Sequence, residues 1–334
     1  MDDRGVSQTM LGTIQKIFEQ NRELVTQTEK AIIYLREQEY EKALTILLST
    51  KEYINYVSET IINQREYFQL VSIDSVEEML EGITEAKRQK DYVLLADLLE
   101  LQLVNFLCSV QEFIMKKEDF LVYNELEYIK NSSVVQQKIM DSDQTLPYLT
   151  EENKIKQGQI LDKELSENLD PAYLLDQGYL VEFTTSGAMT IGAKEANGTK
   201  FYMHSNHIVG KEAFLQAKKW YSEKVNTYIV YGYGLGYHIR ELLSLAPDAN
   251  IEIYESDMNI LKLSCAFSKM TALLEYENVK LFYDPEYTRI KKRLQQLEEC
   301  DKVCIHYPSL RNVKMPEAKE MLLNYVPCAM AVEA

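Results

Sequence analysis

Apolar residues recur at helical spacing through the first part of the chain. Two stripes follow the i, i+3, i+4, i+7 period, one formed by Ile54, Val57, Ile61 and Ile62 and the other running from Leu94 to Val110. Between Ser7 and Met140 the sequence contains no proline and only two glycines, so nothing interrupts this pattern. The pattern predicts an all-helical domain over residues 1–150, built as a helical bundle or as helical hairpins.

Two short segments of this helical region resemble each other. They read Arg36-Glu37-Gln38-Glu39-Tyr40 and Arg88-Gln89-Lys90-Asp91-Tyr92, and a leucine- and alanine-rich helical pattern follows each. The similarity predicts two related helical hairpins. Two copies do not make a solenoid, so a packing bundle is favoured over a repeat protein that binds peptides.

The pattern changes over residues 151–225, where we predict a polar linker, short helices and a small β-meander. Asp170-Pro171 marks the start of a short helix that Gly178 ends, since aspartate caps helices and proline suits their first position. Alternating apolar residues and two glycine turns then predict three antiparallel strands, at residues 179–184, 188–191 and 200–203.

Strand and helix patterns alternate from residue 226 to residue 334. The predicted strands are Thr227–Tyr231, Ile251–Tyr254, Val279–Phe282, Val303–Ile305 and Ala329–Val332. Alternation of this kind predicts a parallel, doubly wound sheet, which is a Rossmann-like α/β domain. No helix pattern follows the last strand, and we therefore expect the domain to be truncated at its C-terminus.

A glycine-rich turn follows the first of these strands and is the best candidate for a ligand site. It reads Gly232-Tyr233-Gly234-Leu235-Gly236 and leads directly into a helical segment. Glycines permit a tight turn and a close ligand approach, and the free amides at a helix start favour an anion. Glu255 ends the next predicted strand, where an acidic side chain accepts hydrogen bonds from ribose hydroxyls. We expect residues 232–236 and Glu255 to bind a cofactor, unless the glycines serve close packing alone.

Charge and composition narrow the possible partners and the location. The formal net charge is −16, which disfavours nucleic acid and anionic membranes as partners. We expect no bilayer-spanning apolar run, no signal peptide and hence a cytoplasmic protein. The five cysteines are scattered without partners at metal-ligand spacing, so we predict free thiols and no metal site.

Three histidines lie at positions where such folds place functional groups, namely His204, His238 and His306. None has a serine or carboxylate partner at motif spacing, and we therefore expect surface or hydrogen-bonded histidines and name no catalytic residue.

Several of these residues together resemble the N-terminal region of the motility accessory factor (Maf) family of flagellin glycosyltransferases. The resemblance rests on Tyr202-Met203-His204-Ser205, Lys211-Glu212-Ala213, the segment from Val230 to His238, and Tyr254-Glu255, and it covers about residues 170–284. It implies a part in transferring nonulosonic acids from CMP-activated donors to flagellin, with the transfer in a later domain that this chain lacks. The chain departs from the family pattern after Ser205, where it has Asn206-His207 in place of aspartate-proline.

Three functions follow from these observations. The first is a Maf-like accessory module with a CMP-type nucleotide as its expected ligand and flagellin or another glycosylated surface protein as its expected partner. The second is a methyltransferase that binds S-adenosylmethionine at the same turn, because the G-x-G-x-G spacing is typical of that class. The third is a helical interaction scaffold without catalysis, with oligomerisation through the helical half.

Overall fold

The structure is a computed structural model that describes residues 8–69, 74–118, 125–167, 169–195 and 197–327. The chain divides into two compact units. Unit 1 consists of positions up to 121 together with residues 183–188 and 206–211, and unit 2 takes the other positions. Each unit is described by itself below.

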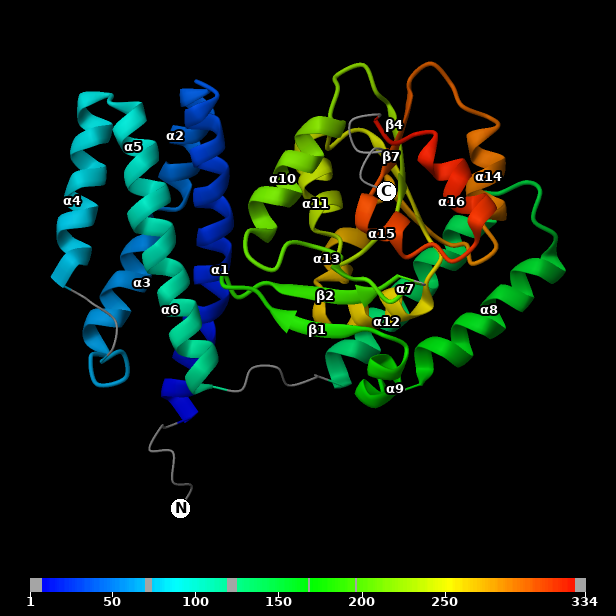
Figure 1. The fold of residues 1–334 in the computed structure, drawn as a ribbon, viewed down its shortest axis with the longest axis horizontal. Coiled ribbons are helices and arrows are strands. Elements are labelled where there is room, and N and C mark those ends of the chain that lie inside the picture. The colour runs from blue at the N-terminus through cyan, green and yellow to red at the C-terminus, as the bar shows by residue number, and fades with distance from the viewer. Residues whose placement is uncertain (1–7, 70–73, 119–124, 168, 196, 328–334) are drawn as a thin grey trace. The chain divides into compact units, whose positions relative to one another are not determined.

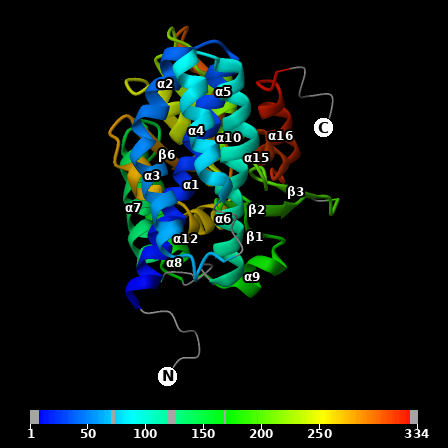
Figure 2. The same cartoon turned by 90° about the vertical axis from the view of Figure 1, so that its left-hand side faces the viewer.

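Unit 1 is helical throughout its N-terminal part, as the apolar spacing predicts. Its long helices run side by side, and α1 contacts most of the elements that follow it (Figures 1 and 2). The elements are α1 (Gln8–Arg36), α2 (Tyr40–Ser49), α3 (Lys51–Asn63), α4 (Asp74–Gln89), α5 (Tyr92–Leu98), a π-helical turn η1 (Leu99–Leu103) and α6 (Val104–Lys117).

The two similar sequence segments adopt the same backbone structure. Gln38 and Lys90, at matching positions, both take the left-handed conformation, with φ of 66° and 58°. In both segments the next amide bonds to a carbonyl five residues earlier, Glu39 to Tyr34 and Asp91 to Ala86, which is a common way to end a helix. The rings of Tyr40 and Tyr92 stack with centroids 4.1 Å apart. The two helix junctions thus share one backbone conformation, and the relation between the two hairpins stays a prediction.

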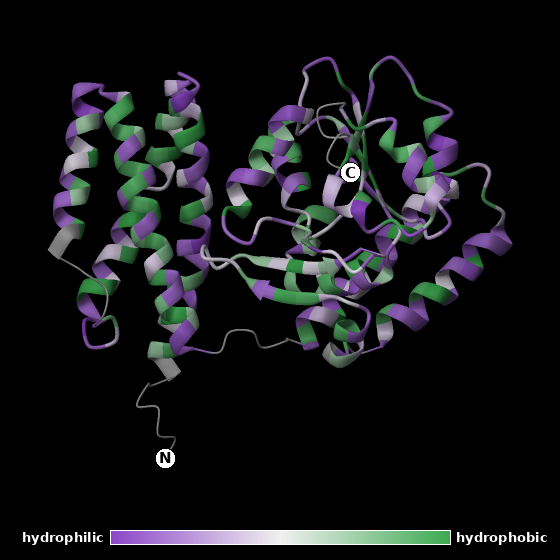
Figure 3. Cartoon of the chain, viewed as in Figure 1, coloured by the Kyte–Doolittle hydropathy of each residue, from purple (hydrophilic) through white to green (hydrophobic). Residues whose placement is uncertain are grey.

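One prediction about this unit is wrong. The continuous helical run Tyr92–Lys117 is long and apolar enough to cross a membrane by length and composition, whereas the sequence predicts no such run. It is largely hydrophobic in Figure 3, and one side of it is buried, including Leu95, Leu99, Leu103 and Leu107. A core helix passes the same test. The expected absence of membrane insertion therefore stays a prediction.

Unit 2 begins with two helices that the sequence-based domain boundaries separate. Those boundaries place the first helix in the helical domain and the second in the linker region. The two helices are α7 (Glu125–Gln144) and α8 (Glu151–Ser166). The Ser142 hydroxyl in α7 accepts a hydrogen bond from the amide of Leu281 in the edge strand β6 (Val279–Tyr283), at 3.1 Å. In α8, Gln157 donates to the Tyr283 carbonyl at 3.1 Å. The chain therefore divides before α7 and not near residue 150, because α7 covers the open edge of a sheet.

A small antiparallel sheet follows, as predicted. Asp170 caps α9 (Pro171–Asp176) by accepting from the amide of Ala172 at 2.9 Å, and Gly178 takes a φ of 88° directly after this helix. The strands β1 (Leu180–Phe183), β2 (Met189–Lys194) and β3 (Lys200–Tyr202) lie in that order in the sheet.

The last part of unit 2 is a parallel sheet with interleaved helices (Figure 1). Its strand order is β6-β5-β4-β7, so the second and third strands lie on one side of the first and the fourth lies on the other. Four of the five predicted strands are confirmed, and Ala329–Val332 lies outside the described residues. The remaining elements are β4 (Thr227–Tyr231), β5 (Asn250–Glu255), β7 (Asp301–Ile305), α10 (Val209–Trp220), α11 (Tyr237–Leu245), α12 (Met258–Phe267), α13 (Met270–Leu274), α14 (Thr288–Leu294), α15 (Tyr307–Arg311) and α16 (Pro316–Leu323).

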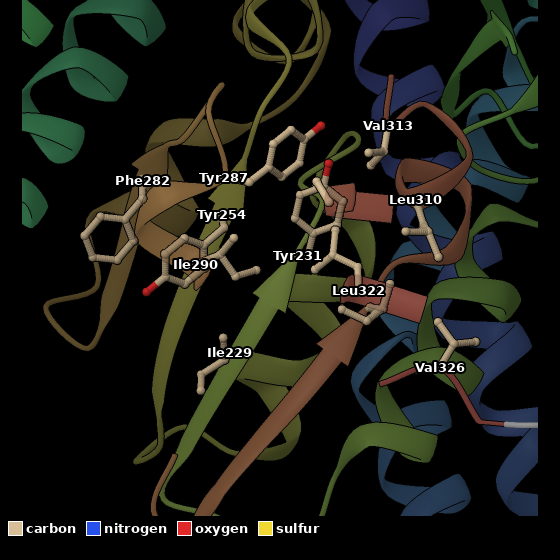
Figure 4. Close-up of a cluster of buried hydrophobic side chains, with 12 residues drawn as sticks. Ile229, Tyr231, Tyr254, Phe282, Tyr287, Ile290, Leu310, Val313, Leu322 and Val326 are labelled. Carbon is tan, nitrogen blue, oxygen red and sulfur yellow. The ribbon is translucent and has the colours of Figure 1, made fainter. Parts of the chain in front are cut away.

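A buried aromatic and aliphatic cluster joins this sheet to the last helices. Tyr231, Tyr254 and Phe282 extend from three neighbouring strands toward Ile290 and Leu322 from α14 and α16 (Figure 4). This packing fixes the strand ends, and therefore the loops that follow them.

Candidate functional site

The glycine turn, residues 232–236, lies between β4 and α11 as predicted. Gly232, Gly234 and Gly236 have φ values of 94°, 53° and 74°, which residues with a side chain rarely adopt. All five residues of the turn are buried. The glycines are therefore required by the backbone conformation, whether or not a ligand is bound.

Side chains of the protein itself fill the space at this turn. A Cβ atom added at Gly232 would lie 2.3 Å from the Cβ of Ser309, and one at Gly234 would lie 2.6 Å from Nε2 of His204. One at Gly236 would lie 2.7 Å from the Tyr233 hydroxyl oxygen. The structure corrects the expectation of an open ligand site at this turn, because the side chains of Ser309, His204 and Tyr233 pack against the glycines. Ligand binding by residues 232–236 stays a prediction that requires this packing to open.

The backbone amides of the turn also have partners within the protein. The amide of Tyr233 donates to the Glu255 carboxylate at 2.9 Å, and that of Leu235 donates to Nε2 of His204 at 2.9 Å. The amide of Gly236 donates to the Tyr233 carbonyl at 2.8 Å. An anionic ligand would have to displace these acceptors before it could use the same amides.

Glu255 lies at the end of β5 as predicted, but its carboxylate points to the backbone. Besides Tyr233 it accepts from the amides of Ser256 and Asp257, at 2.8 and 2.9 Å. Burial raises the pKa of Glu255 to about 7, and the three amide donors oppose that rise. Its carboxylate holds the turn, where the sequence predicts contact with a ribose.

The three histidines that the sequence treats separately come together at this turn. His204 follows β3, His238 lies in the first turn of α11, and His306 follows β7. The rings of His238 and His306 stack with centroids 4.2 Å apart, and the His204 ring lies 5.0 Å from that of His306. We call these residues the histidine cluster. No spacing rule links positions so far apart in the sequence, so only the fold reveals it.

The imidazoles of the cluster are buried and uncharged at neutral pH. Desolvation lowers the pKa of His238 to about 4 and lowers the pKa values of His204 and His306 well below 6.5. One ligand-capable atom from each residue lies within 4.8 Å of the others. Neutral imidazole is the form that binds metals, so the structure brings together a set of possible ligands where the sequence predicts none.

A second polar group lies at the carboxyl ends of the strands, where open α/β sheets bind ligands. The Ser256 hydroxyl is within hydrogen-bonding distance of the Tyr231 hydroxyl at 2.9 Å and the Tyr287 hydroxyl at 3.0 Å. Beside it, Asp257 accepts from the Tyr179 hydroxyl and from the Asn312 amide. Burial and the charge of Asp257 raise the pKa of Tyr179. The sequence gives no signal for these contacts, which join residues from five separate segments.

Comparisons with known proteins add little to this geometry. No protein-family model matches the chain, and no curated protein matches it significantly. The crystal structure of MnmC2 from Aquifex aeolicus is similar over 52% of this chain and 62% of that one, at 18% identity and a TM-score of 0.23. The match therefore spans less than two thirds of that protein, and at this TM-score it assigns neither fold nor function. The parallel sheet, the small antiparallel sheet and the helices around them define the architecture of the chain.

Proposed function

We propose that this chain is a Maf-like module with a Rossmann-like α/β half. In this proposal it is an accessory part of a bacterial system that attaches nonulosonic acids to flagellin or another surface protein. Sugar transfer belongs to a different domain, and the module acts in the cytoplasm. The described cysteines are free thiols, which fits a reducing compartment.

One observation carries this proposal. The separate sequence pieces on which the family resemblance rests meet in one hydrogen-bonded unit. His204, from the first piece, accepts from Leu235 of the glycine turn, and Glu255, from the last piece, accepts from Tyr233. His238 lies 3.1 Å from the carbonyl oxygen of Gly232. Residues that hydrogen-bond to one another are expected to stabilise a particular fold. A stabilising role of this kind suits an accessory module.

The same contacts favour a role without turnover. Amides that already donate to Glu255 and His204 are not available to hold phosphates. A CMP-type nucleotide would bind at this turn only after the His204 and Ser309 side chains move. We therefore assign the module no reaction of its own.

A methyltransferase that uses S-adenosylmethionine is the second candidate. Its support is the strand order together with an acidic residue at the end of β5, the second strand of the parallel sheet. Calorimetric titration of the full chain with S-adenosylmethionine and with CMP separates the candidates. Micromolar binding of S-adenosylmethionine would favour the methyltransferase and contradict our proposal, whereas the accessory role predicts no such binding.

The proposal itself is tested in the source bacterium. Deletion of the gene should remove the glycan mass from flagellin, measured by intact-protein mass spectrometry, and the wild-type gene should restore it. Restoration by an exposed-site variant such as Glu85→Ala is the control, because that side chain lies far along the sequence from the turn and pairs only locally. Unchanged masses of flagellin and of the other glycosylated surface proteins in the deletion strain would overturn the proposal.

A further inference from the structure

The histidine cluster has one polar atom that the fold leaves without a partner. Nε2 of His238 lies 3.1 Å from the carbonyl oxygen of Gly232, which can only accept, so Nε2 carries the proton. The lone pair of His238 is therefore on Nδ1. That atom is buried and has no hydrogen-bond partner. Buried polar atoms in folded proteins are almost always satisfied, which makes this nitrogen an available ligand.

His306 has a contact of the kind that supports a metal-binding histidine. Its Nδ1 lies 2.7 Å from the Ser309 hydroxyl oxygen. When Nδ1 donates to that oxygen, the lone pair of His306 lies on Nε2. Histidines that bind metals usually donate their other nitrogen to such an outer group, which fixes the ring and its tautomer.

His204 supplies the third nitrogen, but this nitrogen already accepts a hydrogen bond from a backbone amide. Its Nε2 accepts from the amide of Leu235 at 2.9 Å. The same nitrogen lies over Gly234, where an added Cβ atom would be 2.6 Å from it and 3.3 Å from Cε1 of His306. An ion at this position would compete with the Leu235 amide for the lone pair of His204.

We propose that His204, His238 and His306 bind one divalent transition-metal ion at the end of the glycine turn. Three neutral imidazoles select ions such as Zn²⁺ or Co²⁺ and not Mg²⁺ or Ca²⁺, which prefer oxygen. The ion ties together the end of β3, the start of α11 and the end of β7. This inference does not depend on the proposed function.

Binding requires a rearrangement. The His238 and His306 rings are stacked, with centroids 4.2 Å apart and planes only 8° apart, so an ion in the plane of one ring lies outside the plane of the other and one ring must tilt to share it. The nitrogens must also approach one another, because bonds of about 2.0–2.1 Å to one tetrahedral ion require closer contact than the present spacing of up to 4.8 Å. Ion binding should therefore draw the three nitrogens together and release the Leu235 amide from His204.

The test uses the full chain, stripped with a chelator and titrated with Co²⁺ while the visible absorption is recorded, with Zn²⁺ as competitor. The wild type should bind one ion per chain in tetrahedral coordination, with the three imidazoles and one water molecule as ligands. His238→Ala should weaken binding by more than the roughly 10–100-fold that loss of an outer-shell partner costs. His207→Ala is the matched control, because His207 is the remaining histidine of the sequence and is exposed.

A second variant and a second measurement keep the test decisive. Ser309→Ala retains all three imidazoles and should weaken binding by about 10–100-fold. Ion binding should also accelerate hydrogen exchange at the Leu235 amide and leave that of Tyr233, held by Glu255, unchanged. Absence of ion binding by the wild type, equal binding by Ser309→Ala, or equal loss in His207→Ala would overturn the proposal.

Discussion

At the scale of single residues, the glycine turn depends on close packing more than on flexibility. Gly232 and Gly198 both have positive φ, 94° and 83°, but their surroundings differ. A Cβ atom at Gly232 would overlap Ser309, whereas one at Gly198 would meet no atom within 4 Å. Comparing these two positions therefore separates the cost of the backbone conformation from the cost of packing.

We predict that Gly232→Ala destabilises the protein by more than Gly198→Ala does. Both variants lose about 1–2 kcal/mol to the left-handed conformation, and Gly232→Ala loses a further ~1–3 kcal/mol to overpacking. Urea denaturation followed by circular dichroism measures the difference. Equal midpoints for the two variants would show that the turn has free space. By the same reasoning Gly234→Val should also destabilise the fold, because a Cβ atom at Gly234 would lie 2.6 Å from Nε2 of His204.

A buried carboxylate in unit 1 makes stability depend on pH. Glu29 accepts from the amide of Lys211 at 2.9 Å, and burial raises its pKa to about 7. Because the folded state holds the proton more tightly than the unfolded state, this contribution is fully present below the ordinary pKa of 4.5. It is lost as pH rises through about 7.

We therefore predict that the unfolding free energy of the wild type falls between about pH 5 and about pH 8, by an amount on the order of 3 kcal/mol from Glu29. Glu29→Gln keeps an oxygen acceptor for Lys211 and cannot ionise, so its stability should fall less over the same range. Denaturation at both pH values measures this. An identical fall in the two proteins would exclude Glu29 as the source.

At the scale of elements, a buried ion pair attaches α7 to α14, the helix that follows β6. Asp143 of α7 accepts two hydrogen bonds from the guanidinium of Arg289 in α14, at 2.9 and 2.8 Å. Asp143 is fully buried. Without Asp143 the Arg289 guanidinium keeps only the more distant Asp284 carboxylate, 3.8 Å away, and loss of one partner of a buried pair is strongly destabilising.

We predict that Asp143→Ala lowers the unfolding free energy by about 3–5 kcal/mol. Glu85→Ala, which breaks an exposed pair with Arg88, should produce no measurable change. Thermal and urea denaturation of both variants provide the comparison. If the two variants unfold at the same point, this pair does not hold α7 to α14.

The elements of the α/β region could be predicted well from the sequence, and their assembly less well. Strands such as Thr227–Tyr231 are short β-branched and aromatic runs between turn signals, so their positions follow from local pattern. The place of α7 does not, because a hydroxyl that closes a sheet edge, as Ser142 does, has no sequence signature. The polar composition of α8 similarly suggests a linker, although Gln157 and Leu161 are buried.

At the scale of the whole molecule, the candidate site was located by the sequence but its chemistry was not. The glycine turn and Glu255 are at the predicted strand ends, since strand-turn-helix order is local information. Which side chains fill the turn depends on tertiary contacts between His204, Ser309 and the glycines. The sequence thus identifies the strand-to-helix turn. Only the packed fold shows whether side chains fill this turn or leave room for a ligand.

The most direct test of this account is residue-resolved amide hydrogen exchange on the chelator-treated protein, without ligand and then with CMP or S-adenosylmethionine. We predict that the amides of Tyr233 and Leu235 exchange slowly without ligand, because Glu255 and His204 accept their hydrogen bonds, and that neither compound changes these rates. Rapid exchange in the free protein, followed by protection when either compound is added, would contradict the closed turn.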